Sequence, residues 1–428
     1  MKRQSPFLID EIAREFVAFP GVPRPNALTF AGTLILALGS AIKAATRLRL
    51  GPSSVHRQNH TTEAWTFARA ETEVLDLIAE ARASITLIEA TELTACWPPA
   101  QLAWARLNAA LRLTGAVLRR PRVLGGLGRA TPCVVTALAE HQLHLRRLRC
   151  GGTLTIVVAN DHSPRQRALL FAAHAARIAT VYVQHAAVGG FESPIIADRN
   201  LVHGVDAARK YLSQGGDGRL YVLGLLKSTK VRELRHGSLP REVGVCPGLH
   251  DNLDALAVQV AETLLPMARA AQVRLVLRPH PRDGRVTLWR DLCDAQGLLF
   301  SDSRSESTVA FLARVRWLVG GDSHISIEAL AGGCPAYLLP SPRPFGEQYG
   351  VIAAGLLRPL PATPEQPPPL DPEVMAAYAH DAGLGFTRLA ALHADLCEGH
   401  MDGLAGRFSS HGPDGEIQVL RREEKASR

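Results

Sequence analysis

The sequence has no cysteine arrangement that points to a metal site or a disulfide framework. Its seven cysteines are scattered over 428 residues, are odd in number and never fall in a Cys-x-x-Cys spacing. Zinc knuckles need closely spaced thiolates, and disulfide scaffolds need paired cysteines. The cysteines are therefore predicted to be reduced and structural, as in a cytoplasmic protein, with no metal bound to them.

Long hydrophobic runs and a signal-peptide pattern are also lacking. The most apolar segment, residues 27–42, has sixteen residues with two glycines, whereas a membrane-spanning helix needs about 20 apolar residues. Two interpretations are open: a core helix, or a segment lying on a membrane surface with the help of Lys43, Arg47 and Arg49. The expected localisation is cytoplasmic, with peripheral contact at the inner face of the membrane under the second interpretation.

Several catalytic motifs are missing. The chain has no G-x-x-x-x-G-K-[ST] loop, no G-x-S-x-G elbow and no H-E-x-x-H, which argues against a P-loop nucleotidase, an α/β-hydrolase and a zinc protease. No Asp-x-Asp pair follows a predicted strand. Chemistry without a metal or a bound cofactor is therefore expected.

Acidic residues are almost absent between Arg106 and Arg149, where nine arginines accompany only Glu140. One interpretation is the solvated face of helices; the other is a basic wall that collects a polyanionic or lipid-linked acceptor. Aromatic residues are nearly absent there apart from Trp104, so the stacking platform of a single-strand binder is missing. A nucleic-acid partner is not expected, although the net charge of +8 favours some anionic ligand.

What the chain does contain is an alternation of short apolar strands and helices, typical of parallel sheets covered on both faces. Residues 1–60 are predicted to be irregular around the apolar segment, and residues 63–83 to form a helix before a strand at 84–88. A first Rossmann-like domain is expected at 61–230, a linker at 227–241, a second such domain at 240–400 and a polar tail at 401–428. The predicted strands are 153–159, 180–184, 199–203, 220–223, 242–246, 273–277, 316–319 and 336–339.

The stretch 273–283 is an apolar strand that ends in Arg278-Pro279-His280-Pro281-Arg282. Proline fixes φ and restricts the preceding residue, so the segment after the strand is predicted to be extended and stiff. One imidazole and two guanidinium groups on such a loop suit an anionic ligand, above all phosphate.

A second strand end carries a glycine pair and two serines. Gly320 and Gly321 permit a tight turn before Ser323 and Ser326, which are predicted to lie at the start of a helix that also carries Glu328. Free amides and hydroxyls at a helix N-terminus form an anion site. Gly321, Ser323 and Ser326 are therefore candidates for binding donor phosphate, and Glu328 for binding a ribose.

In the first half, Asp161 and His185 follow strands that are predicted to end at the same edge of a sheet. Ligands of open parallel sheets bind outside the carboxyl ends of the strands, so these groups are expected to face the second half across a cleft. His185 is the candidate general base, with Asp161 as an alternative base or an orienting carboxylate. His280 is the candidate acid or hydrogen-bond donor to the leaving phosphate.

These residues resemble those of GT-B glycosyltransferases of bacterial surface polysaccharide assembly, of the capsule, lipopolysaccharide and teichoic-acid type. The likeness is carried by Leu-Arg-Pro-His-Pro-Arg at 277–282, Gly-Gly-Asp-Ser-His-Ile-Ser-Ile-Glu-Ala-Leu at 320–330 and Val-Tyr-Val-Gln-His-Ala at 181–186. It is closest to the sialyl and Kdo transferases and the CDP-glycerol glycerophosphotransferases. The resemblance implies two Rossmann-like domains facing across a cleft, with His280, Ser323 and Ser326 on the donor phosphate and His185 as base.

The implied activity is transfer of a sugar, or a related polyol phosphate, from a cytidine nucleotide donor to a surface glycan or a lipid-linked glycan. Two alternatives stay open at this point. One is a nucleotide-sugar epimerase of the same architecture, and the other is a non-catalytic partner that binds nucleotide or glycan in polysaccharide assembly.

Overall fold

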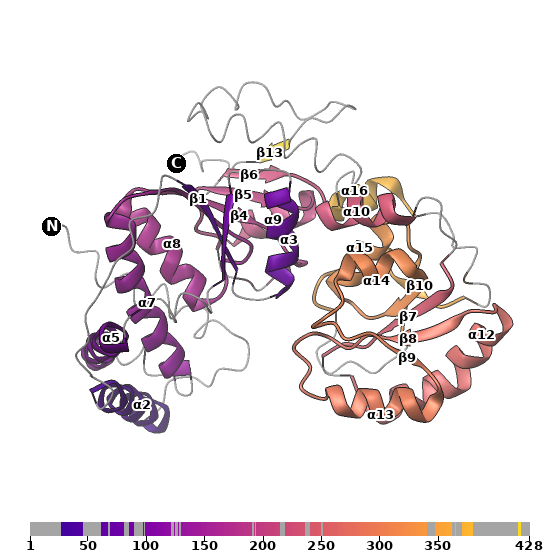
Figure 1. Ribbon diagram of the computed structural model, residues 1–428, viewed down its shortest axis with the longest axis horizontal. Helices are drawn as coiled ribbons and strands as arrows, with labels where there is room; N and C mark the ends of the chain where they lie inside the picture. Colours follow the sequence, from indigo (N-terminus) through magenta and orange to yellow (C-terminus); the bar gives the residue numbers. More distant parts are fainter. Residues whose placement is uncertain are drawn as a thin grey trace, which may run out of the picture.

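The computed structural model describes residues 27–45, 61–66, 69–80, 85–89, 97, 99–120, 124, 127, 130–190, 192, 194–214, 219–235, 240–249, 251–339, 347–361, 364, 370–379 and 418–420. These residues form two α/β lobes, each built on its own sheet (Figure 1). The predicted fold class, two Rossmann-like domains with largely parallel sheets, is confirmed.

The first sheet has seven strands in the order β13-β6-β5-β4-β3-β1-β2, and only the pairing of β13 with β6 is antiparallel. Its strands are β1 (Thr61–Thr66), β2 (Ile85–Glu89), β3 (Thr153–Val158), β4 (Ala179–Val183), β5 (Arg199–Val202), β6 (Arg219–Val222) and β13 (Gln418–Leu420).

The helix predicted at 63–83 is wrong in its first part, because residues 61–66 form strand β1 between β2 and β3. The sequence Thr-Thr-Glu-Ala-Trp-Thr is rich in β-branched and aromatic residues that suit a strand. Trp65 is fully buried there, and helix α3 (Arg69–Glu80) begins three residues after the strand ends. The predicted strand at 84–88 is confirmed as β2.

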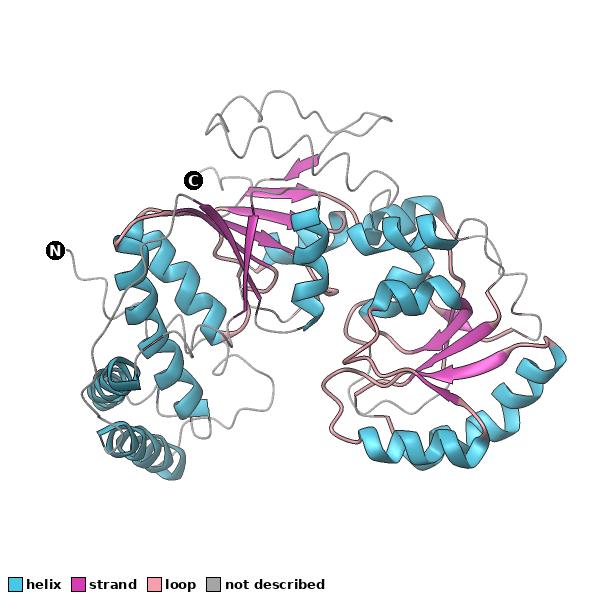
Figure 2. Cartoon of the chain, viewed as in Figure 1, coloured by secondary structure: helices cyan, strands magenta, loops and turns pink. Residues whose placement is uncertain are grey.

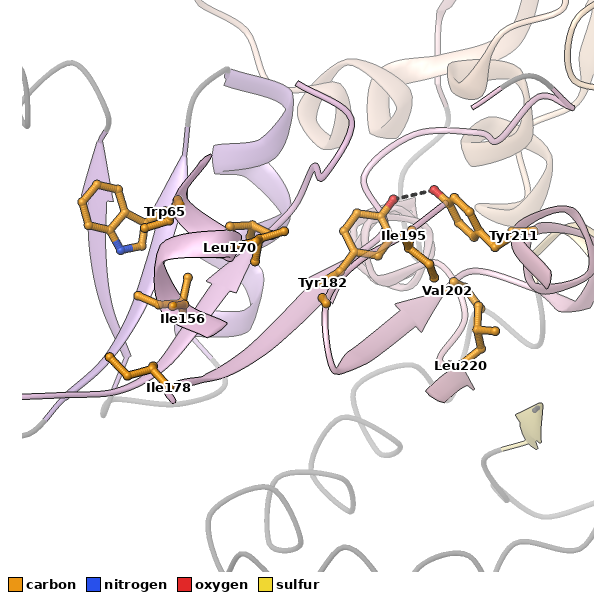
Figure 3. Close-up of a cluster of buried hydrophobic side chains, with 14 of the residues drawn as sticks. Trp65, Ile156, Leu170, Ile178, Tyr182, Ile195, Val202, Tyr211 and Leu220 are labelled. Atoms are coloured by element: carbon orange, nitrogen blue, oxygen red, sulfur yellow. Dashed lines mark hydrogen bonds between the residues drawn. The ribbon is translucent and has the colours of Figure 1, made fainter. Parts of the chain in front are cut away.

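Helices cover both faces of this sheet. Helices α8 (Pro164–Ala176) and α9 (Val205–Ser213) pack on one face, where Figure 3 shows Leu170 and Tyr211 in a cluster with Trp65 and Ile156. Helix α3 packs on the other face through Val74 and its neighbours. A further layer of helices, α2 (Ala27–Ala45), α5 (Pro99–Arg119) and α7 (Thr131–Arg149), shares an alanine-rich core. Of the described helices, none is long and apolar enough to cross a membrane.

The second sheet has six parallel strands in the order β12-β11-β10-β7-β8-β9. Figure 2 shows helices on both of its faces. The apolar side chains of this lobe form two separate cores. Its strands are β7 (Glu242–Cys246), β8 (Arg274–Leu277), β9 (Leu299–Phe300), β10 (Val315–Gly320), β11 (Ala336–Leu338) and β12 (Arg358–Pro359), and its helices are α11 (Leu253–Gln259), the π-helical turn η2 (Val260–Leu264), α12 (Leu265–Ala270), α13 (Val286–Gln296), α14 (Thr308–Arg314) and α15 (His324–Ala331).

The linker predicted at 227–241 is wrong for its first nine residues, because these belong to helix α10 (Leu226–Arg235). Lys227, Ser228 and Thr229 are buried at its start, and Val231 lies in the core of the second lobe. The polar residues that suggested a linker make hydrogen bonds within the second lobe. The Ser228 hydroxyl donates to the Glu328 carbonyl (3.0 Å), and Arg232 donates to the Ala331 carbonyl (2.7 Å).

The chain then returns to the first lobe. Helix α16 (Pro372–Ala379) contacts both α15 and α9, and β13 pairs with β6 although it lies in the segment predicted to be a polar tail. Residues 380–417, which include the end of the predicted second domain, lie outside the described residues. The Lys210 ammonium adds a second contact, donating to the carbonyls of Val188 (3.0 Å) in the first lobe and Tyr349 (2.9 Å) in the second.

Gly204, at the start of α9, sets how closely α9 and α16 approach. A Cβ at this position would lie 2.1 Å from the Ala377 carbonyl oxygen. We therefore expect Gly204→Ala to push the two elements apart and to lower the free energy of unfolding by about 1–3 kcal/mol, as overpacking does. Gly190→Ala is the matched control, because nothing lies within 4 Å of its added Cβ. Urea unfolding of both variants checks this; equal stability would mean that the contact adjusts without cost.

Candidate functional site

A pocket lies between the lobes, at the carboxyl ends of the strands of the first sheet. Residues of β4 and β5 and their following loops supply one wall, and α10 and α15 supply the other. Its lining consists of Val74, Val183, Gln184, His185, Leu201, His203, Leu223, Gly224, Leu225, Leu226, Lys227, His324 and Glu328. We call it the interdomain pocket. Of the predicted site residues, His185 and Glu328 line it.

His185 follows β4 and is held by its own main-chain neighbourhood. Its Nδ1 is hydrogen-bonded to the Ala159 carbonyl oxygen, which accepts only from a protonated nitrogen. The lone pair of the neutral ring is therefore on Nε2. Burial, followed by the positive charge of Lys227, lowers the pKa of His185 to about 3. The ring is thus neutral across physiological pH and presents one hydrogen-bond acceptor.

Lys227 joins the two lobes through an ion bridge. Its ammonium lies 3.0 Å from Oε1 of Glu328, on α15, and 3.5 Å from Oε2 of Glu73, on α3. Burial alone would lower the pKa of Lys227, but the two carboxylates outweigh it and raise the pKa above its usual value. Burial likewise acts to raise the pKa of Glu328, yet Lys227 and His324 hold it well below its usual range. Lys227 and Glu328 are therefore both charged at neutral pH.

Two histidines stack across the same boundary. His203 follows β5 and His324 begins α15, and their rings lie 5.0 Å apart at an angle of 11°. The His324 Nε2 atom is also 3.2 Å from Oε1 of Glu328. Burial, then the nearby His324, lowers the pKa of His203 well below its usual value. His203 is therefore a neutral ring that packs on the first residue of α15.

The charges of this pocket favour hydroxyl groups over phosphate. One ammonium faces two carboxylates, and the neutral rings of His185 and His203 add no positive charge. An anion placed between them would be repelled by Glu73 and Glu328. A sugar or ribose, whose hydroxyls both donate and accept, matches carboxylate and imidazole acceptors.

Asp161 lies apart from this lining. It is fully buried, and its Oδ2 accepts from the Ile196 amide (3.0 Å). Its Oδ1 is 3.5 Å from Nδ1 of His162, whose Nε2 is 3.1 Å from the Tyr211 hydroxyl. Tyr211 in turn hydrogen-bonds Tyr182 (2.9 Å; Figure 3). Asp161 thus lies beside His162, whereas Nδ1 of His185 is bonded to the Ala159 carbonyl, so the placement does not support Asp161 as the carboxylate that orients His185. The side chain is also fully buried, which argues against the predicted alternative base.

The residues of the loop after β8 differ in their exposure and contacts. Arg278 is buried and donates to the Ser301 hydroxyl (2.9 Å) and the Glu306 carbonyl (3.0 Å), so it holds the loop to its own domain. Arg282 is exposed, and its amide donates to Nδ1 of His280 (3.1 Å). His280 is partly exposed and does not belong to the described lining of the interdomain pocket. The prediction that Arg278 contacts a donor phosphate is therefore wrong, whereas contact of His280 and Arg282 with that phosphate stays a prediction.

The turn after β10 has the predicted form, a helix whose N-cap is Ser323. Ser323 makes no side-chain capping bond and lies 3.4 Å from the Ser326 hydroxyl, which donates to the Gly321 carbonyl (2.9 Å). Asp322 accepts from the Tyr349 amide (3.0 Å), and the charges of both Asp322 and Arg282 act on the Tyr349 phenol. The loops after β8 and β10 therefore share one end of the second sheet.

Sequence reasoning missed Lys227, His203 and His324 as members of the pocket lining, and Glu73 as an ion-pair partner of Lys227. His203 ends a predicted strand, so the rule that selected His185 would also have selected it. His324 stands within a quoted motif but was not chosen. Lys227 gave no such signal, since it was assigned to a polar linker. Within the described ranges, no group of three or more His, Cys, Asp or Glu side chains is arranged to hold a metal ion.

No family model matches the sequence, and no curated protein matches it either. Solved structures do match. A Listeria monocytogenes protein provisionally described as a UDP-N-acetylglucosamine 2-epimerase superposes with a TM-score of 0.50 at 12% identity, covering 80% of this chain and 97% of that one. The chain has the GT-B fold.

Two further GT-B structures are more distant. The Neisseria meningitidis UDP-GlcNAc 2-epimerase bound to UDP-GlcNAc has a TM-score of 0.46 at 13% identity, with 78% and 99% of the two chains covered. The wall teichoic acid polymerase TagF has a TM-score of 0.43 at 10% identity, with 87% and 97% covered. At these identities the likeness concerns the GT-B fold, and function must be argued from the site.

Proposed function

We propose that this chain is a metal-independent transferase that moves a sugar, or a related polyol phosphate, from a cytidine nucleotide to a bacterial surface glycan or lipid-linked glycan. The donor would be a CMP-sugar such as a sialic acid or Kdo donor, or a CDP-linked group. The observation that carries the proposal is the interdomain pocket, where the free Nε2 of His185 and the carboxylate of Glu328 come from opposite lobes.

Each group has a role in this proposal. Glu328 accepts hydrogen bonds from ribose hydroxyls, and the exposed Arg282, His280 and the start of α15 bind the donor phosphate outside the negatively charged pocket. His185 accepts a hydrogen bond from the acceptor hydroxyl and takes its proton as the new bond forms, while charge on the leaving phosphate is offset by His280. Domain closure supplies the orientation.

A nucleotide screen by thermal shift tests the donor class. A ligand that binds only the folded chain stabilises it by about 2.7 kcal/mol at a concentration of about 100 Kd. We expect CMP or CDP to raise the unfolding temperature more than UDP or GDP does. His280→Ala should reduce that shift and cripple turnover while the protein stays folded. His174→Ala, which removes a histidine bonded to Thr180, should leave both unchanged.

The second candidate is a nucleotide-sugar epimerase, favoured by the description of the Listeria GT-B structure. Incubation with UDP-N-acetylglucosamine alone would then yield an isomer without any acceptor. A preference for UDP together with that isomer would replace the first proposal. Silence toward every nucleotide would instead indicate a non-catalytic partner in polysaccharide assembly.

A further inference from the structure

Helix α2 has its large and small apolar residues on the opposite sides from those of an ordinary surface helix, and α5, although it buries Leu113 and Val117, also leaves large apolar residues exposed. Where α2 packs against the rest of the first lobe it buries Ala37, Ala41 and Ala44. A helix at the surface of a globular domain normally turns its large apolar side chains toward the core. Here they point outward instead.

The outward residues form one stripe on each helix. On α2 they recur at intervals of three and four, and on α5 at intervals of seven, so each set shares one face. Their exposed fractions are 68% for Ile35, 46% for Leu38, 66% for Ile42, 50% for Trp104, 53% for Leu111 and 59% for Leu118. The two helices pack against each other at the outer end of the first lobe (Figure 1). We call these six residues the α2–α5 face.

The charges on these helices have one sign. Neither α2 nor α5 contains an aspartate or a glutamate, whereas Lys43 ends α2 and Arg106, Arg112 and Arg119 lie along α5. Two copies of the chain meeting through this face would bring basic groups together with no carboxylate on either helix to pair them. A bilayer with anionic headgroups has the complementary charge, and it accepts aliphatic side chains below those headgroups.

We propose that the α2–α5 face docks the protein on the surface of an anionic lipid bilayer, with both helices lying in the interface. The exposed Trp104 suits the headgroup region, where tryptophan is enriched. Large aliphatic side chains enter the acyl boundary, and the exposed Lys43 and Arg119 meet the anionic headgroups. The inference does not depend on which nucleotide the interdomain pocket takes.

Co-sedimentation of the full chain with vesicles, in the absence of nucleotide, tests this docking. We expect binding to phosphatidylglycerol vesicles, little binding to phosphatidylcholine vesicles, and weakening between about 0.05 M and about 0.5 M salt as charges are screened. The double variant Ile35→Glu, Leu111→Glu should reduce binding about tenfold or more, because it places one carboxylate in each stripe.

Leu234→Glu is the matched control, since Leu234 is a leucine of similar exposure, 51%, on helix α10 of the other lobe. It should bind vesicles as the native chain does, and all three proteins should unfold at similar urea concentrations. The proposal is overturned by absence of binding to phosphatidylglycerol, by equal binding of the double variant, or by a native dimer that the double variant dissolves. Nucleotide thermal shifts, measured separately, report on the donor site, so a negative result there would count against the proposed function and not against membrane docking.

Discussion

Lys227→Met is expected to lower the free energy of unfolding by about 3–5 kcal/mol, the usual effect of removing one partner from a buried ion pair. The Lys227 side chain is 5% exposed, and its loss leaves Glu328, itself 3% exposed, without its nearest positive charge. Lys230→Met on the same helix is the control, because its side chain is 39% exposed and its pair with Glu233 lies at the surface. Such pairs contribute about 0–1 kcal/mol.

The difference in unfolding free energy between the native chain and Lys227→Met should become smaller as pH falls. In the native chain the pKa of Glu328 is held low, so its contribution to stability is present above the pKa of an unfolded glutamate and is lost as pH falls. In Lys227→Met the ammonium no longer offsets the effect of burial, which raises the pKa of Glu328. Protonation of Glu328 at lower pH then removes its buried charge and relieves the destabilisation. The gap between the two proteins should therefore narrow from about pH 7.5 to about pH 4.5.

Urea unfolding at both pH values measures this gap. Lys227→Met combined with Glu328→Gln should recover part of the lost stability at neutral pH, since neither charge of that pair then remains. Equal, small losses in the Lys227 and Lys230 variants would mean that the ion bridge contributes nothing to folding.

His185→Ala is expected to lower kcat about 10²–10⁴-fold, the range that general acid–base groups contribute. The donor contacts assigned to the other lobe are untouched, so the cytidine-nucleotide thermal shift should persist. Because burial and Lys227 lower the pKa of His185 to about 3, the neutral ring is available throughout about pH 5–8. Its function should therefore not be lost as pH falls through the usual histidine range near 6.5.

Transfer is measured with a radiolabelled donor and product separation, with His174→Ala as the control for removing an imidazole elsewhere in the lobe. Near-native turnover in His185→Ala would remove this residue as the base, and the assignment of the pocket as the acceptor site would need another proton acceptor.

The sequence was most informative where a buried strand ends. Parallel strands put their carboxyl ends at one edge of a sheet, so His185 could be predicted to face the second half of the chain. In the structure it lines the interdomain pocket together with Glu328. Arg278 shows the limit of that rule, because a strand-end arginine was predicted to face a ligand but is turned into the core by Ser301 and Glu306. Side-chain direction within a loop depends on partners that are distant in sequence.

The burial of Lys227 and the outward direction of the apolar stripe on α2 could not be predicted from the sequence for a related reason. Lys227 stands among polar residues, and such a stretch is typical of a linker. Its burial depends on ion pairs with Glu73 and Glu328, which are distant in the sequence. The apolar segment at 27–42 was correctly predicted to be helical, but almost all of its residues are apolar. Its pattern could not indicate which face packs against α5, and only the packed helices reveal that alanines are inside.

The return of the chain through α16 to β13 has a consequence for synthesis. The first sheet is an interrupted unit, because its edge strand is encoded after the whole second sheet. During translation, β6 can pair with residues 418–420 only after nearly two hundred further residues have left the ribosome. An unpaired strand edge is a site of wrong association, so in the nascent chain the β6 edge is left open for that interval.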